Sequence, residues 1–166
     1  MGDESLTKGK EPVEMLKSGQ LLSIGGGNNA GLIIQKPFFA EFVSHGAAIG
    51  GLFDLQCVTV YTLGEVQITV PADKTERQAA FQQRIADIEA MQHLCQADSP
   101  LERGVAILQH LCDQFDPYQV ESVPNDVLAK LVGVLPSTIA SAWTYIQSQS
   151  QEPLESCIAQ QTVPAA

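Results

Sequence analysis

Residues 124–147 read PNDVLAKLVGVLPSTIASAWTYIQ, and the spacing of small and apolar residues in this stretch decides the fold. Two helices that cross at about 90–120° need a small residue where their backbones approach, which suits Ala129. The tight turn between them needs a residue that adopts a positive φ, which suits Gly133 four positions later. We expect one core to receive the apolar side chains Leu128, Val132, Val134, Ile139 and Trp143. The stretch therefore predicts a helix-turn-helix.

Two further helices are expected before this unit. Ser99 is placed to cap a helix in which Pro100 takes the first position and Glu102 reaches back to the cap. Earlier in the chain, Asp73 and Glu76 resemble another capping box, and the apolar period there changes from two to about 3.6. These signals predict a long connecting helix followed by a shorter one.

The connecting helix carries an apolar stripe made of Phe81, Ile85, Ile88, Met91 and Cys95. Phe81, Ile88 and Cys95 are seven residues apart, and this spacing suits a core-facing helix and a seam between two copies of the chain equally well. Both interpretations stay open at this point. The residues assigned to a dimer or partner interface are Phe81, Ile85, Ile88 and Cys95.

The N-terminal part of the chain has the pattern of β-structure. Short apolar runs at 21–24 and 30–34 flank a turn rich in glycine and asparagine. Residues 58–61 and 66–70 alternate between apolar and polar, and Gly64 between them predicts that they form a hairpin. A buried element is expected to contain Phe38, Phe39 and Phe42.

These patterns predict an α+β fold. It consists of a short N-terminal β region, either a hairpin or a partial roll, a long connecting helix and a C-terminal helix-turn-helix bundle. The termini are polar: the N-terminal segment is expected to be a frayed, flexible arm or a single helical turn, and the C-terminal segment a loosely held, flexible tail. The predicted divisions are an arm at 1–19, a glycine-rich β region at 20–72, the connecting helix at 73–97, the helix-turn-helix domain at 98–148 and a tail at 149–166.

The pattern Leu-Ala-x-x-x-Gly-Val-x-x-x-x-Ile at residues 128–139 resembles helix-turn-helix transcription regulators, most of all the C-terminal module of the catabolite-activator/Fnr type. The resemblance covers about residues 66–147, with a divergent and shortened N-terminal region before it. It implies regulation of transcription through bound DNA. At helical spacings of three and four, and with one lysine from the preceding helix, the residues expected to contact DNA are Lys130, Ser137, Thr138, Ser141 and Tyr145.

Charge keeps a second function open. The net charge of −10 repels phosphate at long range, and between residues 99 and 149 the basic residues are Arg103 and Lys130. The alternative is an adaptor that retains the helical fold without binding DNA. Such an adaptor would hold a protein partner in a larger assembly through the apolar stripe and the 38–42 region.

Other function classes find no support in the sequence. The glycine-rich turn lacks the Gly-Lys-Ser/Thr ending of a phosphate loop, and the three histidines are too scattered to form a ligand set. No Cys-x-x-Cys pair occurs among Cys57, Cys95, Cys112 and Cys157. We therefore expect a cytoplasmic protein that is not an enzyme, binds no cofactor or metal, and does not insert into a membrane.

Overall fold

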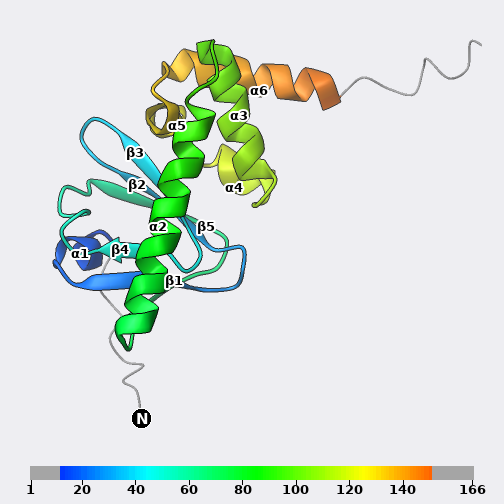
Figure 1. The fold of residues 1–166 in the computed structure, drawn as a ribbon. Coiled ribbons are helices and arrows are strands. Elements are labelled where there is room, and N and C mark those ends of the chain that lie inside the picture. The colour runs from blue at the N-terminus through cyan, green and yellow to red at the C-terminus, as the bar shows by residue number, and fades with distance from the viewer. Residues whose placement is uncertain (1–11, 151–166) are drawn as a thin grey trace, which may run out of the picture.

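The structure is a computed structural model that describes residues 12–150. Within this range the strands are β1 (Leu21–Gly26), β2 (Gly31–Gln35), β3 (Ala40–Ser44), β4 (Ala48–Gly50), β5 (Thr59–Leu63) and β6 (Val66–Thr69). The helices are α1 (Pro12–Lys17), α2 (Lys74–Leu94), α3 (Pro100–Cys112), α4 (Pro117–Glu121), α5 (Asn125–Val132) and α6 (Pro136–Ser150). The predicted α+β fold, with strands first, a long helix next and a helical C-terminal part, is confirmed (Figure 1).

The strands form two antiparallel three-stranded sheets with the orders β4-β1-β6 and β3-β2-β5. β2 lies at the centre of the second sheet, and its residues from Gly31 to Ile34 are all buried. Leu32 and Ile34 pack in the core shared with β1, while Ile33 packs in the core shared with the C-terminal helices. The uninterrupted apolar run at 30–34 therefore reflects a strand that is covered on both faces.

The predicted hairpin of residues 58–61 and 66–70 is wrong. β5 pairs with β2, whereas β6 pairs with β1, so two consecutive strands enter different sheets. Gly64 turns the chain between them with a φ of +71°. Alternation identified both strands correctly, but it does not identify the partner of a strand. Here the partners are β1 and β2, whose paired residues lie 24 to 46 positions earlier in the chain.

Three other expectations need correction. The range expected as a flexible arm or a single helical turn, 1–19, contains the short helix α1, whose Leu16 is fully buried against the β core, so this part is not a flexible arm. Residues 1–11 lie outside the described residues. α6 ends at Ser150, beyond the expected domain end at 148, and the rest of the expected tail, 151–166, also lies outside the described residues. Phe42 is buried as expected, but Phe38 is 92% exposed and Phe39 is 44% exposed, because both occupy the turn between β2 and β3.

The capping signals are confirmed. Asp73 accepts a hydrogen bond from the amide of Glu76 at the start of α2. At the start of α3, Ser99 and Glu102 form a complete capping box. Local side-chain chemistry therefore fixes where both helices begin.

The helix-turn-helix is present. α5 and α6 meet at 97°, and Gly133 ends α5 in the left-handed conformation with a φ of +63°. Ala129 and Leu128 are buried in the core that also holds Ile139. α3 packs against α6, where a Cβ added at Gly104 would lie 3.2 Å from the Cβ of Ala142.

His110 lies where α3 packs on β3. Its ring meets the ring of Phe42 edge-on, with 6.0 Å between centroids, and its Nε2 atom lies 3.0 Å from Nε2 of Gln114. Burial lowers the pKa of His110 below its ordinary value of 6.5, although Asp113 and Asp87 act in the opposite direction. The folded protein therefore favours the neutral imidazole.

We expect His110 to make the free energy of unfolding decrease when the pH is lowered. Its contribution is complete above pH 6.5 and is lost as the pH drops through the lowered pKa of the folded state, because the unfolded chain takes up the proton first. Urea unfolding at about pH 7.5 and about pH 5.5 measures this difference. His110→Gln should reduce the pH dependence, whereas His93→Gln, at an exposed position, should leave it unchanged. Equal pH dependence in both variants would contradict the assignment.

Candidate functional site

The outer face of α6 carries small hydroxyl-bearing side chains. Ser137, Ser141 and Tyr145 are exposed, and Thr138 is half-buried. The hydroxyl of Ser141 donates to the backbone carbonyl of Ser137 at 3.1 Å. The Ser141 hydroxyl must therefore rotate away from the helix backbone before it donates a hydrogen bond to a phosphate or base of DNA. The structure places these four sequence-predicted residues on one helix.

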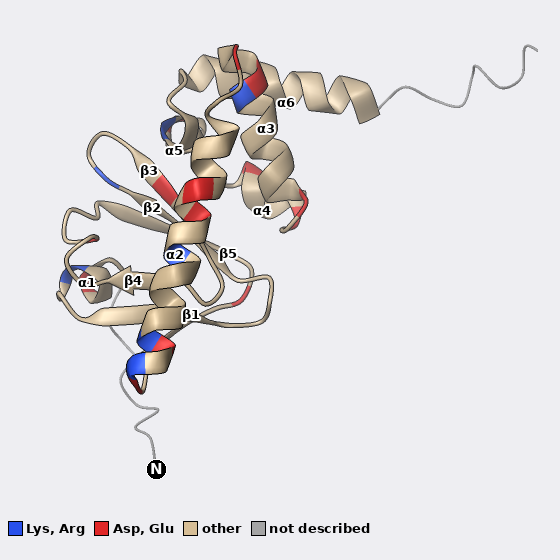
Figure 2. Cartoon of the chain, viewed as in Figure 1, with Lys and Arg blue, Asp and Glu red and all other residues tan. Residues whose placement is uncertain are grey.

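The surroundings of α6 hold little positive charge. α6 has no charged residue, and the helical part of the chain is mostly without basic positions (Figure 2). Lys130 lies half-buried in the last turn of α5, and Nη1 of Arg103 donates to the carbonyl of Ala97 at 3.1 Å. The α6 face is thus neutral, neither attracting nor repelling phosphate strongly by itself.

The inner face of α2 is bound to the β region by charged groups. Arg84 lies 2.9 Å from Glu41 and 3.3 Å from Asp54, and Lys36 forms ion pairs with the same two carboxylates. Asp54 is fully buried, and both Arg84 and Lys36 are nearly so. Two positive and two negative charges therefore balance inside the protein, which offsets the cost of removing them from water.

A second polar contact holds α2 one turn further along. Asp87 is buried and accepts hydrogen bonds from the amide of Ser44 at 2.8 Å and from its hydroxyl at 2.7 Å. The side-chain amide of Gln83 donates a further hydrogen bond to the same carboxylate. These polar groups face inward, and Phe81, Ile85 and Ile88 of the apolar stripe are exposed beside them.

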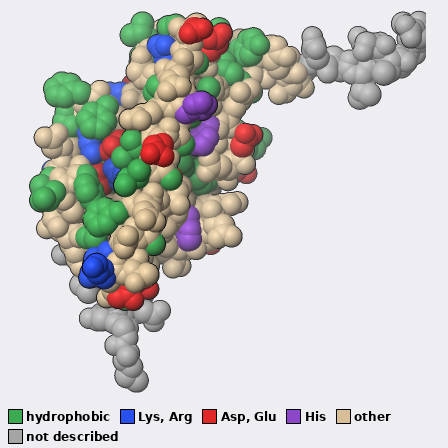
Figure 3. Space-filling model, viewed as in Figure 1, with side chains coloured by type: hydrophobic (Ala, Val, Ile, Leu, Met, Phe, Trp, Pro, Cys, Tyr) green, Lys and Arg blue, Asp and Glu red, His purple; other side chains and the backbone are tan. Residues whose placement is uncertain are grey.

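The outward stripe continues over the neighbouring loops. The apolar surface, as we call it, consists of Phe38, Phe39, Leu52, Phe53, Phe81, Ile85 and Ile88. Phe53 and Phe81 meet edge-on at 5.8 Å, and Phe53 and Phe39 lie beside the buried cations Arg84 and Lys36. Figure 3 shows hydrophobic side chains gathered over α2 and the loops beside it.

An apolar groove of about 380 Å³ adjoins this surface. It lies between β3, the second half of α2 and α5, and it is lined by Ala40, Glu41, Phe42, Ile88, Met91, Gln92, Cys95, Gln96 and Leu131. Ile88 belongs to both the groove and the apolar surface. The two features therefore form one continuous face on this side of α2.

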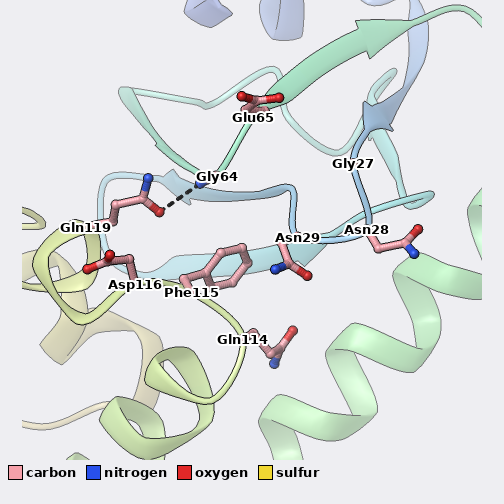
Figure 4. A pocket seen from close by; sticks show the side chains of 9 residues that line it. All are labelled: Gly27, Asn28, Asn29, Gly64, Glu65, Gln114, Phe115, Asp116 and Gln119. Carbon is pink, nitrogen blue, oxygen red and sulfur yellow. Dashed lines mark hydrogen bonds between the residues drawn. The ribbon is translucent and has the colours of Figure 1, made fainter.

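A polar cleft of about 520 Å³ lies elsewhere, between the strand turns and the loop from α3 to α4. Figure 4 shows its lining residues, which are Gly27, Asn28, Asn29, Gly64, Glu65, Gln114, Phe115, Asp116 and Gln119. The amide of Gly64 donates to Oε1 of Gln119 at 3.1 Å, which joins the strand turn to α4. The nine lining residues include no nucleophile paired with a base.

The assigned interface residues lie on one face of α2. Phe81, Ile85, Ile88 and Cys95 are all exposed, so these four side chains of the stripe do not belong to the core. Met91 is partly buried and packs on the helical core instead. The buried ion cluster was not predicted, because no local pattern connects its four members.

Cysteines and acidic residues form no further site in residues 12–150. Cys57, Cys95 and Cys112 are free thiols, and burial raises the pKa of Cys57 and of Cys112. In the same range, no group of three or more His, Cys, Asp or Glu side chains is arranged to hold a metal ion.

No described helix is by itself long and apolar enough to cross a membrane. α5 and α6 reach the required length and composition only when they are joined across their 97° bend.

No protein-family model matches the chain, and a search of curated proteins finds no match either.

Proposed function

We propose that the protein binds duplex DNA through α6 and acts as a transcription-regulator-like protein. The observation that carries the proposal is the right-angled arrangement of α5 and α6 around Gly133, which leaves the outer face of α6 free. The major groove is about 12 Å wide and admits one α-helix. Recognition helices of this kind are held in the groove by a preceding helix that rests on the backbone.

The side chains on α6 suit a close approach to DNA. Ser137, Ala140 and Ser141 are small and exposed, so the helix backbone is able to lie deep in a groove. Tyr145, one turn further on, is 47% exposed and adds a hydroxyl at the rim. Lys130, in the last turn of α5, is the basic residue of the α5–α6 pair and the one that could meet a phosphate. The proposed contacts are therefore few, and affinity depends on a small number of phosphates.

The first test measures binding of labelled DNA fragments by fluorescence anisotropy at low and at physiological salt. Affinity should fall as salt rises, and Lys130→Glu should weaken binding and reduce the slope of log K against log salt by about 1. Lys74→Glu makes the same charge change at the start of α2, far from α6 (Figure 1), and should leave binding near wild type. Equal loss in both variants would indicate a general charge effect and would contradict a contact at Lys130.

A second variant tests the α6 face itself. Ser141→Glu places a carboxylate in the middle of the exposed face, where it would meet the phosphates or base acceptors of bound DNA. We expect binding to be lost. Gln109→Glu, on the exposed side of α3, is the matched control and should retain binding. Full binding by Ser141→Glu would refute the proposed role of α6.

The second candidate function is an adaptor that binds protein. The neutral α6 and the net charge of −10 favour it, as does an apolar surface that lies on α2 rather than on the helix-turn-helix. No anisotropy change at low salt would refute DNA binding and leave this candidate. Phe39→Asp and Phe81→Asp should then remove a co-purifying protein, and retention of that protein in both variants would refute the adaptor as well.

A further inference from the structure

The outer face of α2 has the spacing of a helix-pairing seam. The seam, as we define it, consists of Gln78, Phe81, Ile85, Ile88, Gln92 and Cys95. The steps between successive members alternate between three and four residues, which is the a/d pattern of paired helices. Every member is exposed, and although Phe81 also packs edge-on against Phe53, between 39% and 54% of Phe81, Ile85 and Ile88 stays uncovered in the single chain.

The orientation of α2 makes the seam available. A surface helix normally turns its apolar stripe toward the core and its polar side toward water. In α2 the buried side chains include Arg84 and Asp87, which bind Asp54 and Ser44 of the β region. Polar contacts thus fix the rotation of the helix and leave its apolar stripe exposed along the edge of the buried side, where Ile85 is 54% exposed.

The size of the apolar surface also points to a partner. Monomeric soluble proteins rarely expose a continuous apolar patch larger than a few hundred Å². A completely covered aromatic side chain buries roughly 150–250 Å², and the four phenylalanines of the apolar surface have between 39% and 92% of their area exposed, beside Leu52, Ile85 and Ile88. With the seam and the adjoining groove, this face approaches the ~800 Å² that each partner contributes to a standard interface.

We propose that a second copy of this chain covers the face, with the two α2 helices paired in parallel along the seam. Charge favours a second copy over an unlike partner. Each chain has a net charge of −10, yet the seam contains no charged residue, so two identical copies meet here without repulsion between like charges. The same 3–4 spacing on both helices supplies matching knobs and holes.

The parallel direction follows from the two unlike ends of the seam. Toward the start of α2, Phe81 lies against Phe53 and makes an aromatic cluster. Toward its end, the seam contains Gln92 and is flanked by Gln96. Parallel pairing places the aromatic clusters of both copies together and lets the glutamine side-chain amides form hydrogen bonds with each other. Antiparallel pairing would place the aromatic rings of one copy against the amides of the other.

This pairing does not depend on DNA binding, and its test is the mass of the full chain in solution by light scattering. The wild-type protein should have twice the mass of one chain at micromolar concentration. Ile85→Asp should raise the dimer dissociation constant by about 100-fold, because it places two carboxylates against each other at the centre of the seam. A wild-type protein that stays monomeric at high concentration would overturn the proposal.

The matched control is Ala86→Asp. Ala86 is exposed and follows Ile85 directly, so its side chain is turned by about 100° away from the seam. This variant introduces the same charge on the same helix and should remain dimeric. Unchanged circular dichroism in both variants excludes unfolding, which is expected because Ile85 is half exposed in one chain. Equal dissociation of both variants would refute the seam.

Cys95 tests the direction of pairing. In the parallel arrangement two Cys95 thiols meet across the seam, whereas an antiparallel pair centred on Ile85 would hold them about 30 Å apart. Diamide accepts the two electrons and two protons that a pair of thiols loses on forming a disulfide, so it should give a covalent dimer. Cys95→Ser should not give one. A dimer that forms no cross-link through Cys95 would refute the parallel arrangement.

Discussion

Arg84→Leu is expected to lower the free energy of unfolding by about 3–5 kcal/mol, which is the cost of breaking a buried ion pair by removing one partner. Asp54 is fully buried, and it would keep only Lys36, at 3.3 Å, as an opposite charge. Glu41 would lose its 2.9 Å contact at the same time, and the carbonyl of Ala48 would lose the Nη1 donor. The change therefore leaves one excess negative charge in a cluster whose Asp54 is fully buried.

Urea unfolding followed by circular dichroism at one fixed protein concentration measures the loss. Arg77→Leu is the matched control, because Arg77 is an exposed arginine on the same helix, and its replacement should change stability by no more than about 0.5 kcal/mol. Arg84→Lys should fall between the two, since it keeps the charge but not the fork that reaches two carboxylates. An effect of Arg84→Leu equal to that of Arg77→Leu would mean that the ion cluster does not hold α2 in place.

The parts of the fold that the sequence predicted are those set by neighbouring residues. Ala129 and Gly133 mark the crossing and the turn of the helix-turn-helix four positions apart, and both act within their own helix pair. The caps at Asp73 and Ser99 bind amides three residues away. Such interactions are complete within one short window, so the pattern of residue types is enough to find them.

The arrangement of the strands could not be predicted in the same way. Residues 59–63 and 66–69 alternate as half-buried strands do, and a short turn between two such strands is typical of a hairpin. The edges of β1 and β2 compete for them, and β6 pairs with β1 over four residues while β5 pairs with β2 over five. That competition depends on contacts between distant residues, which a local pattern does not contain.

The candidate site was predicted in part, and the missing part is the ion cluster. Periodicity found the stripe of Phe81, Ile85 and Ile88 but left open whether it faced the core. The answer depends on Arg84, whose partners lie 30 and 43 residues away in the chain. A signal was present, since an arginine and an aspartate three residues apart, Arg84 and Asp87, interrupt the side of α2 that a core-facing helix would keep apolar.

Gly64→Ala is expected to cost about 2–4 kcal/mol of the free energy of unfolding, because the turn at Gly64 sends β5 and β6 into different sheets. A Cβ there would lie 1.8 Å from the backbone carbonyl oxygen of Asn29, and the φ of +71° is unfavourable for alanine. Relief of the overlap requires the turn to move. That movement also breaks the hydrogen bond that the Gly64 amide donates to Oε1 of Gln119. The variant should therefore weaken the attachment of α4 to the strands.

Two other glycines separate the causes of this loss. Gly27 lines the same cleft, has no positive φ and has nothing within 4 Å of an added Cβ, so Gly27→Ala should change stability by no more than about 0.5 kcal/mol. Gly133 has a φ of +63° but open space around it, so Gly133→Ala should show only the conformational cost of about 1–2 kcal/mol. Urea unfolding of the three variants should rank the losses in the order Gly64, Gly133 and Gly27. If Gly64→Ala lost no more than Gly133→Ala, backbone conformation alone would explain both, and the close approach to Asn29 would not constrain the turn.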